Sequence, residues 1–290
     1  MLSGFLNFLA FGANTKPGEP RVPLYRHGAV VRITHWLNAG VLLVMLMSGL
    51  QIFNAHSALY WGQQSTFAHP LFSLTAMQNS AGNIVQGITQ IGSWHFDTTG
   101  ALGASRVDGV LTARGFPDWA TLPGPQWLAM GRVWHFFFAW LFVINGALFA
   151  IYAFARGHAR DLTPNGRDIR NVPHEIVEHV KLRFPKGEAA KRYNALQKLA
   201  YFTVIFILGP LIVLTGLTMS PTMDAAFPWL LWIFDGRQSA RTIHFICAFS
   251  FVAFFIIHIV MVILSGTWNN VRSMITGRYF IERDARGAHE

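Results

Sequence analysis

Four histidines lie inside long apolar stretches of the chain, where titratable side chains are rare. They are His35, His135, His244 and His258. A polar group at membrane depth is energetically expensive and is usually retained for a function. Imidazole is a common ligand of iron, copper and zinc, so these residues predict metal or haem ligation. Polar contacts between helices or a proton relay would be the alternatives.

The last two of these histidines share one apolar run, which has no charged residue between Arg241 and Arg272. His244 and His258 are fourteen positions apart, which is almost four helical turns and roughly 21 Å along an α-helix. Both side chains therefore leave nearly the same face of one helix, one near each leaflet. This spacing favours two haem irons, each held between two imidazoles.

The composition indicates a membrane protein. Of the 290 residues, 52% are hydrophobic and only 13% are charged, whereas soluble domains have about 25% charged residues. The single cysteine, Cys247, excludes an internal disulfide and a cysteine-held zinc or iron–sulfur site. The net charge of +9 does not predict a nucleic-acid partner, because the basic residues cluster at the ends of the apolar runs.

The apolar runs predict an all-α membrane protein, a bundle of four transmembrane helices forming a single domain over residues 1–290. The spans are expected at about 33–53, 131–155, 197–219 and 240–266. Segment 54–130 would then lie outside the membrane, with short helices on its surface, and segment 156–196 would be the cytoplasmic link. Within that link, residues 174–184 predict an amphipathic helix that begins at Pro173. Pro210 predicts a kink in the third span.

The distribution of lysine and arginine predicts the orientation. The N-terminal arm, the link with the adjoining Lys198, and the C-terminal tail carry 18 of the 23 basic residues, which places both termini in the cytoplasm by the positive-inside rule. Residues 1–11 are apolar and predict a short interfacial segment. On this topology His35 and His258 pair on the cytoplasmic side, and His135 and His244 pair on the periplasmic side.

The pattern Arg-x-x-His occurs three times and supports the haem interpretation. The arginines are Arg32, Arg132 and Arg241, which precede His35, His135 and His244. Each arginine lies one helical turn nearer the membrane surface, where a guanidinium could bind a haem propionate in a bidentate manner. The alternative is that they are ordinary interfacial arginines. Small residues in the spans could let a macrocycle approach the backbone or serve helix packing: Gly40, Ser48, Gly49, Gly146, Gly209 and Gly216.

Several motifs resemble the bacterial cytochrome b561 family. They are Arg26-His27-Gly28, Arg32-Ile33-Thr34-His35-Trp36-Leu37-Asn38, Ser48-Gly49, Tyr193-Asn194-Ala195-Leu196-Gln197-Lys198, Leu214-Thr215-Gly216-Leu217 and the pair His244 and His258. That family includes the membrane cytochrome b subunits of nickel–iron hydrogenases, formate dehydrogenases and thiosulfate reductases. The resemblance covers residues 24–277 and implies four transmembrane helices, two haem b groups and electron exchange with a quinone. His35, His135, His244 and His258 match the family's axial ligands.

The resemblance and the histidine pattern together predict an electron-transfer subunit of a bacterial inner membrane. It would relay electrons between quinone and a periplasmic redox enzyme of the molybdopterin oxidoreductase or hydrogenase type, embedded among membrane lipids. The long segment 54–130 suggests that such a partner exists. Asn38 and His27 are the candidate quinone contacts near the cytoplasmic pair. A self-contained superoxide:quinone oxidase and a histidine-lined proton channel or transporter are the alternatives.

Overall fold

The computed structural model describes residues 21–181 and 193–282. Within them four helices are long and apolar enough to cross a membrane. They are α2 (Ala29–Phe53), α3 (Leu128–Ala155), the span Ala195–Thr218 and α10 (Arg237–Leu264). The prediction of four membrane-spanning helices is confirmed, and each helix begins two to four residues before its predicted start. The apolar segment 1–11 and the end of the predicted surface helix, 182–184, lie outside the described residues.

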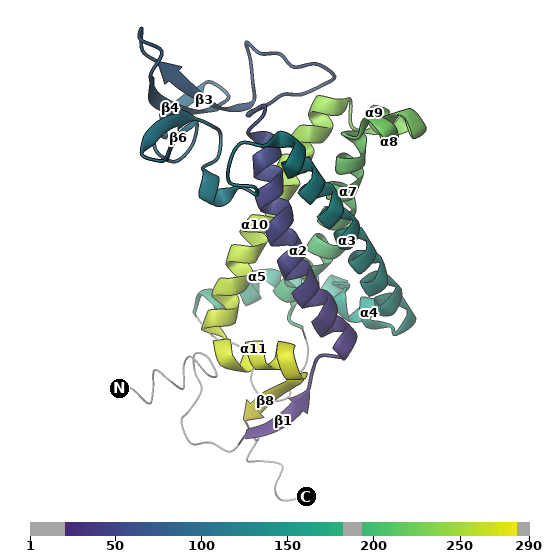
Figure 1. The fold of residues 1–290 in the computed structure, drawn as a ribbon. Coiled ribbons are helices and arrows are strands. Elements are labelled where there is room, and N and C mark those ends of the chain that lie inside the picture. Colours follow the sequence, from purple (N-terminus) through teal and green to yellow (C-terminus); the bar gives the residue numbers. More distant parts are fainter. Residues whose placement is uncertain (1–20, 182–192, 283–290) are drawn as a thin grey trace, which may run out of the picture. The chain divides into compact units, whose positions relative to one another are not determined.

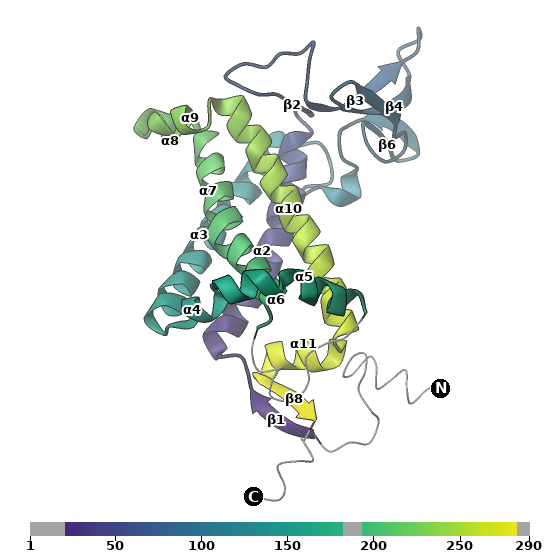
Figure 2. The same cartoon turned by 180° about the vertical axis from the view of Figure 1, so that it is seen from behind.

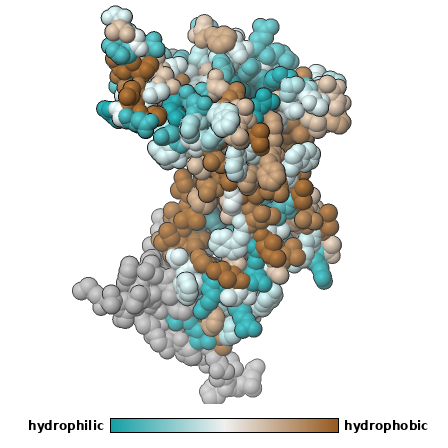
Figure 3. Space-filling model, viewed as in Figure 1, coloured by the Kyte–Doolittle hydropathy of each residue, from teal (hydrophilic) through white to brown (hydrophobic). Residues whose placement is uncertain are grey.

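The chain divides into two compact units, and each spanning helix contributes to both. The first unit comprises Gly146–Gly209 and Phe249–Glu290 together with Met1–Trp36, so far as these are described. The second comprises Leu37–Asn145 and Pro210–Ala248. In Figure 3 the apolar residues gather along the long helices, which is the pattern expected where lipid replaces water as the solvent.

In the first unit a two-stranded sheet joins segments from opposite ends of the chain. β1 (Arg21–Tyr25) pairs antiparallel with β8 (Arg278–Glu282), with Leu24 opposite Tyr279 (Figures 1 and 2). α11 (Thr267–Thr276) leads into β8 through Gly277, whose φ of 81° favours glycine at this helix end. The strand pair therefore ties the start of α2 to the end of α11.

The described part of the link between the second and third spans contains the helices α4 (His158–Leu162) and α5 (Gly166–Val180). The prediction that a helix begins at Pro173 is wrong. α5 begins seven residues earlier, at Gly166, and Pro173 lies inside it. At the start of α5 the Asn165 side chain accepts hydrogen bonds from the backbone N–H groups of Arg167 and Asp168.

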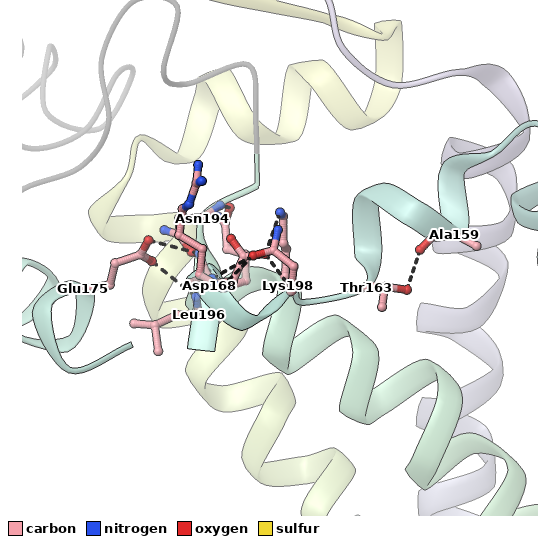
Figure 4. Close-up of polar contacts among 11 residues, drawn as sticks. Ala159, Thr163, Asp168, Glu175, Asn194, Leu196 and Lys198 are labelled. Carbon is pink, nitrogen blue, oxygen red and sulfur yellow. Dashed lines mark hydrogen bonds and ion pairs between the residues drawn. The ribbon is translucent and has the colours of Figure 1, made fainter. Parts of the chain in front are cut away.

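Figure 4 shows how α5 is held to α6 (Ala195–Phe202). The Glu175 carboxylate accepts from the backbone N–H groups of Ala195 and Leu196, and Lys198 forms a 3.0 Å ion pair with Asp168. A carboxylate at a helix N-terminus is favoured by the orphan N–H donors and the helix dipole.

The third span contains an irregular segment before Pro210. Residues Thr203–Leu208 are π-helical and separate α6 from α7 (Gly209–Thr218). Proline has no N–H to donate to the carbonyl four residues earlier, and local π geometry is a common response to a broken helical ladder. The expected disturbance at Pro210 therefore appears as a change in helix type.

The segment between the first two spans forms strands in the second unit, so the prediction of short surface helices is wrong. One antiparallel sheet has the order β2-β3-β4-β5, and a separate hairpin pairs β6 with β7; β2, β3, β4 and β6 are labelled in Figure 2. The strands are β2 (Ala58–Leu59), β3 (Phe72–Gln78), β4 (Ile84–Ile91), β5 (Trp94–Asp97), β6 (Ala104–Val107) and β7 (Val110–Ala113). We call residues 58–113 the strand segment. Short helices follow in the same unit: η1 (Asp118–Ala120), α8 (Pro221–Ala226) and α9 (Trp229–Ile233).

Local turn chemistry explains why β3 and β4 form a hairpin. The Asn79 side chain accepts hydrogen bonds from the backbone N–H groups of Ala81 and Asn83, at 3.0 and 2.9 Å. Gly82 adopts a φ of 80°, which completes the turn at little steric cost. The following strand, Ile84–Ile91, is rich in isoleucine, valine and threonine, which favour extended backbone.

An apolar cluster joins the strand segment to the helix ends of the second unit. Phe53, Leu59, Leu74 and Phe116 are buried together, and Phe245 of α10 lies 4.9 Å from Phe53 between ring centres. Burial of each such side chain is worth about 1.5–3 kcal/mol relative to full exposure. The strand segment is therefore packed onto the ends of α2 and α10 and is not a loose loop.

Candidate functional site

The structure brings the four histidines together as two pairs. In the second unit the ring centres of His135 on α3 and His244 on α10 are 6.2 Å apart, with an interplanar angle of 64°. In the first unit the ring centres of His35 on α2 and His258 on α10 are also 6.2 Å apart, at 56°. All four rings are partly buried.

This separation fits one metal ion between each pair. A metal–imidazole nitrogen bond is about 2.0 Å and the ring centre lies roughly 1.1 Å further on, so two imidazoles on opposite sides of an ion have centres about 6.2 Å apart. Directly packed rings can be closer, as Phe53 and Phe245 are at 4.9 Å. The spacing of both pairs therefore leaves room for a bis-imidazole iron.

The His135 ring is anchored by one turn of α2. Its Nδ1 lies 3.1 Å from the Ser48 hydroxyl oxygen and 3.1 Å from the Met45 carbonyl oxygen. A Cβ added to Gly49 would lie 3.3 Å from the His135 Cε1 atom. The imidazole is thus fixed at Nδ1, which leaves Nε2 as the atom available to a metal.

The His244 ring is anchored in the same way by one turn of α7. Its Nδ1 lies 3.1 Å from the Thr215 hydroxyl oxygen and 3.0 Å from the Ile212 carbonyl oxygen. A Cβ added to Gly216 would lie 3.3 Å from the His244 Cε1 atom. The two helix pairs of this unit therefore use the same arrangement: a hydroxyl, a carbonyl three residues earlier and a glycine immediately after. We call each arrangement a histidine seat.

The surroundings of the other pair are different. The His35 Nδ1 atom is buried and has no hydrogen-bond partner among the described residues. The His258 ring stacks on Phe254, with ring centres 5.7 Å apart and an interplanar angle of 19°. Ring contacts continue from Phe254 to Tyr201 at 6.5 Å and from Tyr201 to Tyr193 at 5.5 Å. This pair is therefore supported by aromatic packing, whereas the seats fix the other pair by hydrogen bonds.

The three arginines of the repeated pattern have different neighbours. Arg32 donates to the Ile275 carbonyl, and Arg241 donates to the His56 carbonyl and lies 5.3 Å over the Phe53 ring. The exposed Arg132 lies 5.5 Å over the Phe136 ring. A guanidinium has five N–H donors, so these contacts are compatible with a further carboxylate partner at each arginine.

The two candidate quinone contacts belong to different units. Asn38 lies in the second unit, where its side-chain oxygen accepts a 2.7 Å hydrogen bond from Asn145 of α3. His27 lies in the first unit, just before α2. Burial, with Arg26, His35, His158 and Arg32 nearby, lowers the pKa of His27 from 6.5 to about 4. His27 is therefore a neutral hydrogen-bonding group at physiological pH.

This depressed pKa predicts an acid-sensitive fold. The folded protein binds the His27 proton less tightly than the unfolded chain, so stability is lost as the pH falls from 6.5 towards 4. At about 1.36 kcal/mol per pKa unit the full loss is on the order of 3 kcal/mol. The variant His27→Gln should show a flatter dependence of Tm on pH in this range. Thermal unfolding in detergent measures it, with His95→Gln on the exposed strand β5 as the control, and equal slopes for His27→Gln and the wild type would contradict it.

The fold defines a multi-pass membrane protein, and the imidazole pairs fit one that binds haem. The family model of prokaryotic cytochrome b561 matches residues 26–277. The chain belongs to the prokaryotic cytochrome b561 family, a family of membrane cytochromes that bind haem b. The resemblance predicted from the sequence is confirmed.

The chain is also similar to one relative over most of its length. That relative is the protein-methionine-sulfoxide reductase subunit YedZ1 of Azospira oryzae, which is 26% identical over 240 residues. The match covers 82% of this chain and 90% of the relative.

Proposed function

We propose that the chain is a di-haem b cytochrome that relays electrons between membrane quinone and a periplasmic redox enzyme. The observation that carries this proposal is the equal 6.2 Å ring separation of two imidazole pairs, His35 with His258 and His135 with His244. Two imidazoles would hold each iron and leave it no free site for oxygen, which suits electron transfer. When bound, haem b supplies a one-electron couple between ferric and ferrous iron.

The residues around each pair would hold and shield such a group. The seats fix the orientation of His135 and His244, while Phe254 packs on His258. Arg32, Arg132 and Arg241 would bind propionate groups through their remaining N–H donors. Both termini would lie in the cytoplasm, as the distribution of basic residues indicates.

We place the quinone near the pair in the first unit, with His27 as the hydrogen-bonding candidate there; Asn38, which belongs to the second unit, is a separate candidate. A quinol gives up two electrons and two protons on oxidation to quinone, and two one-electron centres could take these electrons in turn. Stopped-flow reduction by a quinol analogue tests the location. Unchanged rates in both His27→Gln and Asn38→Ala would reject it.

The strand segment and the residues after it are the proposed docking surface for the enzyme partner. Their exposed aromatic side chains include Trp61, Trp94 and Trp119, which are 54, 70 and 80% exposed, and aromatic residues are enriched in protein interfaces. Since the relative YedZ1 is named as a methionine-sulfoxide reductase subunit, we propose that the partner reduces oxidised methionine. That reaction takes two electrons and two protons and gives methionine and water, which balances the oxidation of one quinol.

Purification of the native complex tests this function directly. We expect a reduced-minus-oxidised spectrum with a b-type α-band, two haem b per chain by pyridine haemochrome, and a copurifying soluble reductase. A colourless protein would instead favour a channel or transporter. Quinone reduction by superoxide in the purified chain alone would favour the self-contained oxidase.

A further inference from the structure

The hydroxyl groups of the two histidine seats have a defined hydrogen-bonding role. The Ser48 hydroxyl donates to the Val44 carbonyl at 2.7 Å, so its oxygen faces His135 as an acceptor. The Thr215 hydroxyl donates to the Leu211 carbonyl at 2.8 Å, so its oxygen likewise faces His244 as an acceptor. Ser48 and Thr215 are both fully buried, so water does not compete for these oxygens.

It follows that Nδ1 carries the proton in both histidines. The second neighbour of each Nδ1 is a backbone carbonyl, Met45 for His135 and Ile212 for His244, and a carbonyl oxygen can only accept. Each N–H is therefore shared between two acceptors, and the Nε2 lone pair of each ring is free for a metal. Acceptors at Nδ1 also make an imidazole a more basic ligand.

The hydrogen bonding at the imidazole Nδ1 atoms differs between the two pairs. In the second unit both imidazoles have two acceptors at Nδ1, whereas the His35 Nδ1 has none among the described residues. More basic axial ligands stabilise ferric iron over ferrous iron, because the ferric ion carries the larger positive charge, and this lowers the reduction potential.

We propose that Ser48 and Thr215 are positioning residues that fix the Nδ1–H tautomer of His135 and His244 and set a lower potential for the haem between them than for the haem between His35 and His258. This rests on the proposed di-haem function. The hydroxyls contact the Nδ1 atoms of His135 and His244, so they would act on a metal at Nε2 through the imidazoles.

Redox titration of the α-band in the purified full chain tests the proposal. The double variant Ser48→Ala/Thr215→Val should raise the lower of the two midpoint potentials and leave the higher midpoint potential unchanged. The expected rise corresponds to about a tenfold change in the reduction equilibrium, or roughly 59 mV for one electron. The conservative variants Ser48→Thr and Thr215→Ser should restore the wild-type value. Thr218→Val is the matched control, because Thr218 is also buried on α7 and donates to the Leu214 carbonyl but makes no hydrogen bond to an imidazole among the described residues.

Single-haem variants keep the test decisive if the double variant loses its haem. His258→Ala should retain the centre with the lower potential, and His244→Ala the centre with the higher one. The reverse order, or a double variant that shifts both centres equally or neither, would overturn the proposal while leaving the di-haem function intact. A haem content other than two per wild-type chain would instead count against the function.

Discussion

His244→Ala is expected to lower the haem content of the purified chain from two haem b to one. The variant removes one of the two imidazoles whose ring centres lie 6.2 Å apart, and it leaves Thr215 and Ile212 without their hydrogen-bonding partner. The other pair, His35 with His258, belongs to the first unit and should keep its haem. Pyridine haemochrome per mole of chain measures the loss, and a redox titration should then show a single transition.

His258→Ala provides the complementary variant. It should also retain one haem, but the retained centre should have the spectrum and potential that His244→Ala lacks. His95→Ala on the exposed strand β5 should keep both haems. Two haems in His244→Ala would contradict the assignment, and so would identical spectra from the two single-haem variants.

Gly216→Val is expected to displace the same haem without substituting a ligand. A Cβ at this position would already lie 3.3 Å from His244 Cε1 and 3.6 Å from Nδ1. Valine adds two further carbons on a side chain with one strongly preferred rotamer in a helix. The ring cannot retreat without losing its bonds to Thr215 and Ile212, so we expect the haem of this pair to fall to a minor fraction of its wild-type occupancy.

Gly49→Val should have the same effect through His135, whose Cε1 would lie 3.3 Å from the added Cβ. Gly40→Val is the matched control on α2. Gly40 is nine positions before Gly49, which places it on the opposite face of the helix, and a Cβ there meets nothing within 4 Å. Full haem content in Gly216→Val, or equal losses in Gly40→Val and Gly49→Val, would contradict the role of the seats.

The sequence was sufficient to predict the membrane helices and the four histidines on them. Long uncharged runs have few structural alternatives, and histidine is rare enough within them to be noticed. The seats were not predicted. Ser48 stood out for its small size and as part of a family motif, and Thr215 only as part of a family motif, because the contact of a hydroxyl with an imidazole depends on the rotation of two neighbouring helices. The adjacent pairs Ser48-Gly49 and Thr215-Gly216 are the signal that could have indicated them.

The strand segment was also missed, for a different reason. Its hairpin is set by local turn chemistry at Asn79 and Gly82, whereas the prediction relied on low charge and on the expectation that a long segment next to a membrane lies on its surface. The isoleucine-rich stretch Ile84–Ile91 carries the β signal, but its apolar residues suit a surface helix equally well when the turn before it is not recognised.

The last spanning helix supplies one histidine to each pair, since His244 and His258 both belong to α10. A nascent chain that has not yet reached residue 244 therefore contains neither complete ligand set, and one that ends before residue 258 lacks His258 of the first unit. Cofactor loading at both pairs has to follow synthesis and membrane insertion of α10, and a chain truncated by premature termination before α10 would be unable to retain haem by either pair. The synthesis and insertion of α10 is thus the single step of biogenesis on which haem binding by both pairs depends.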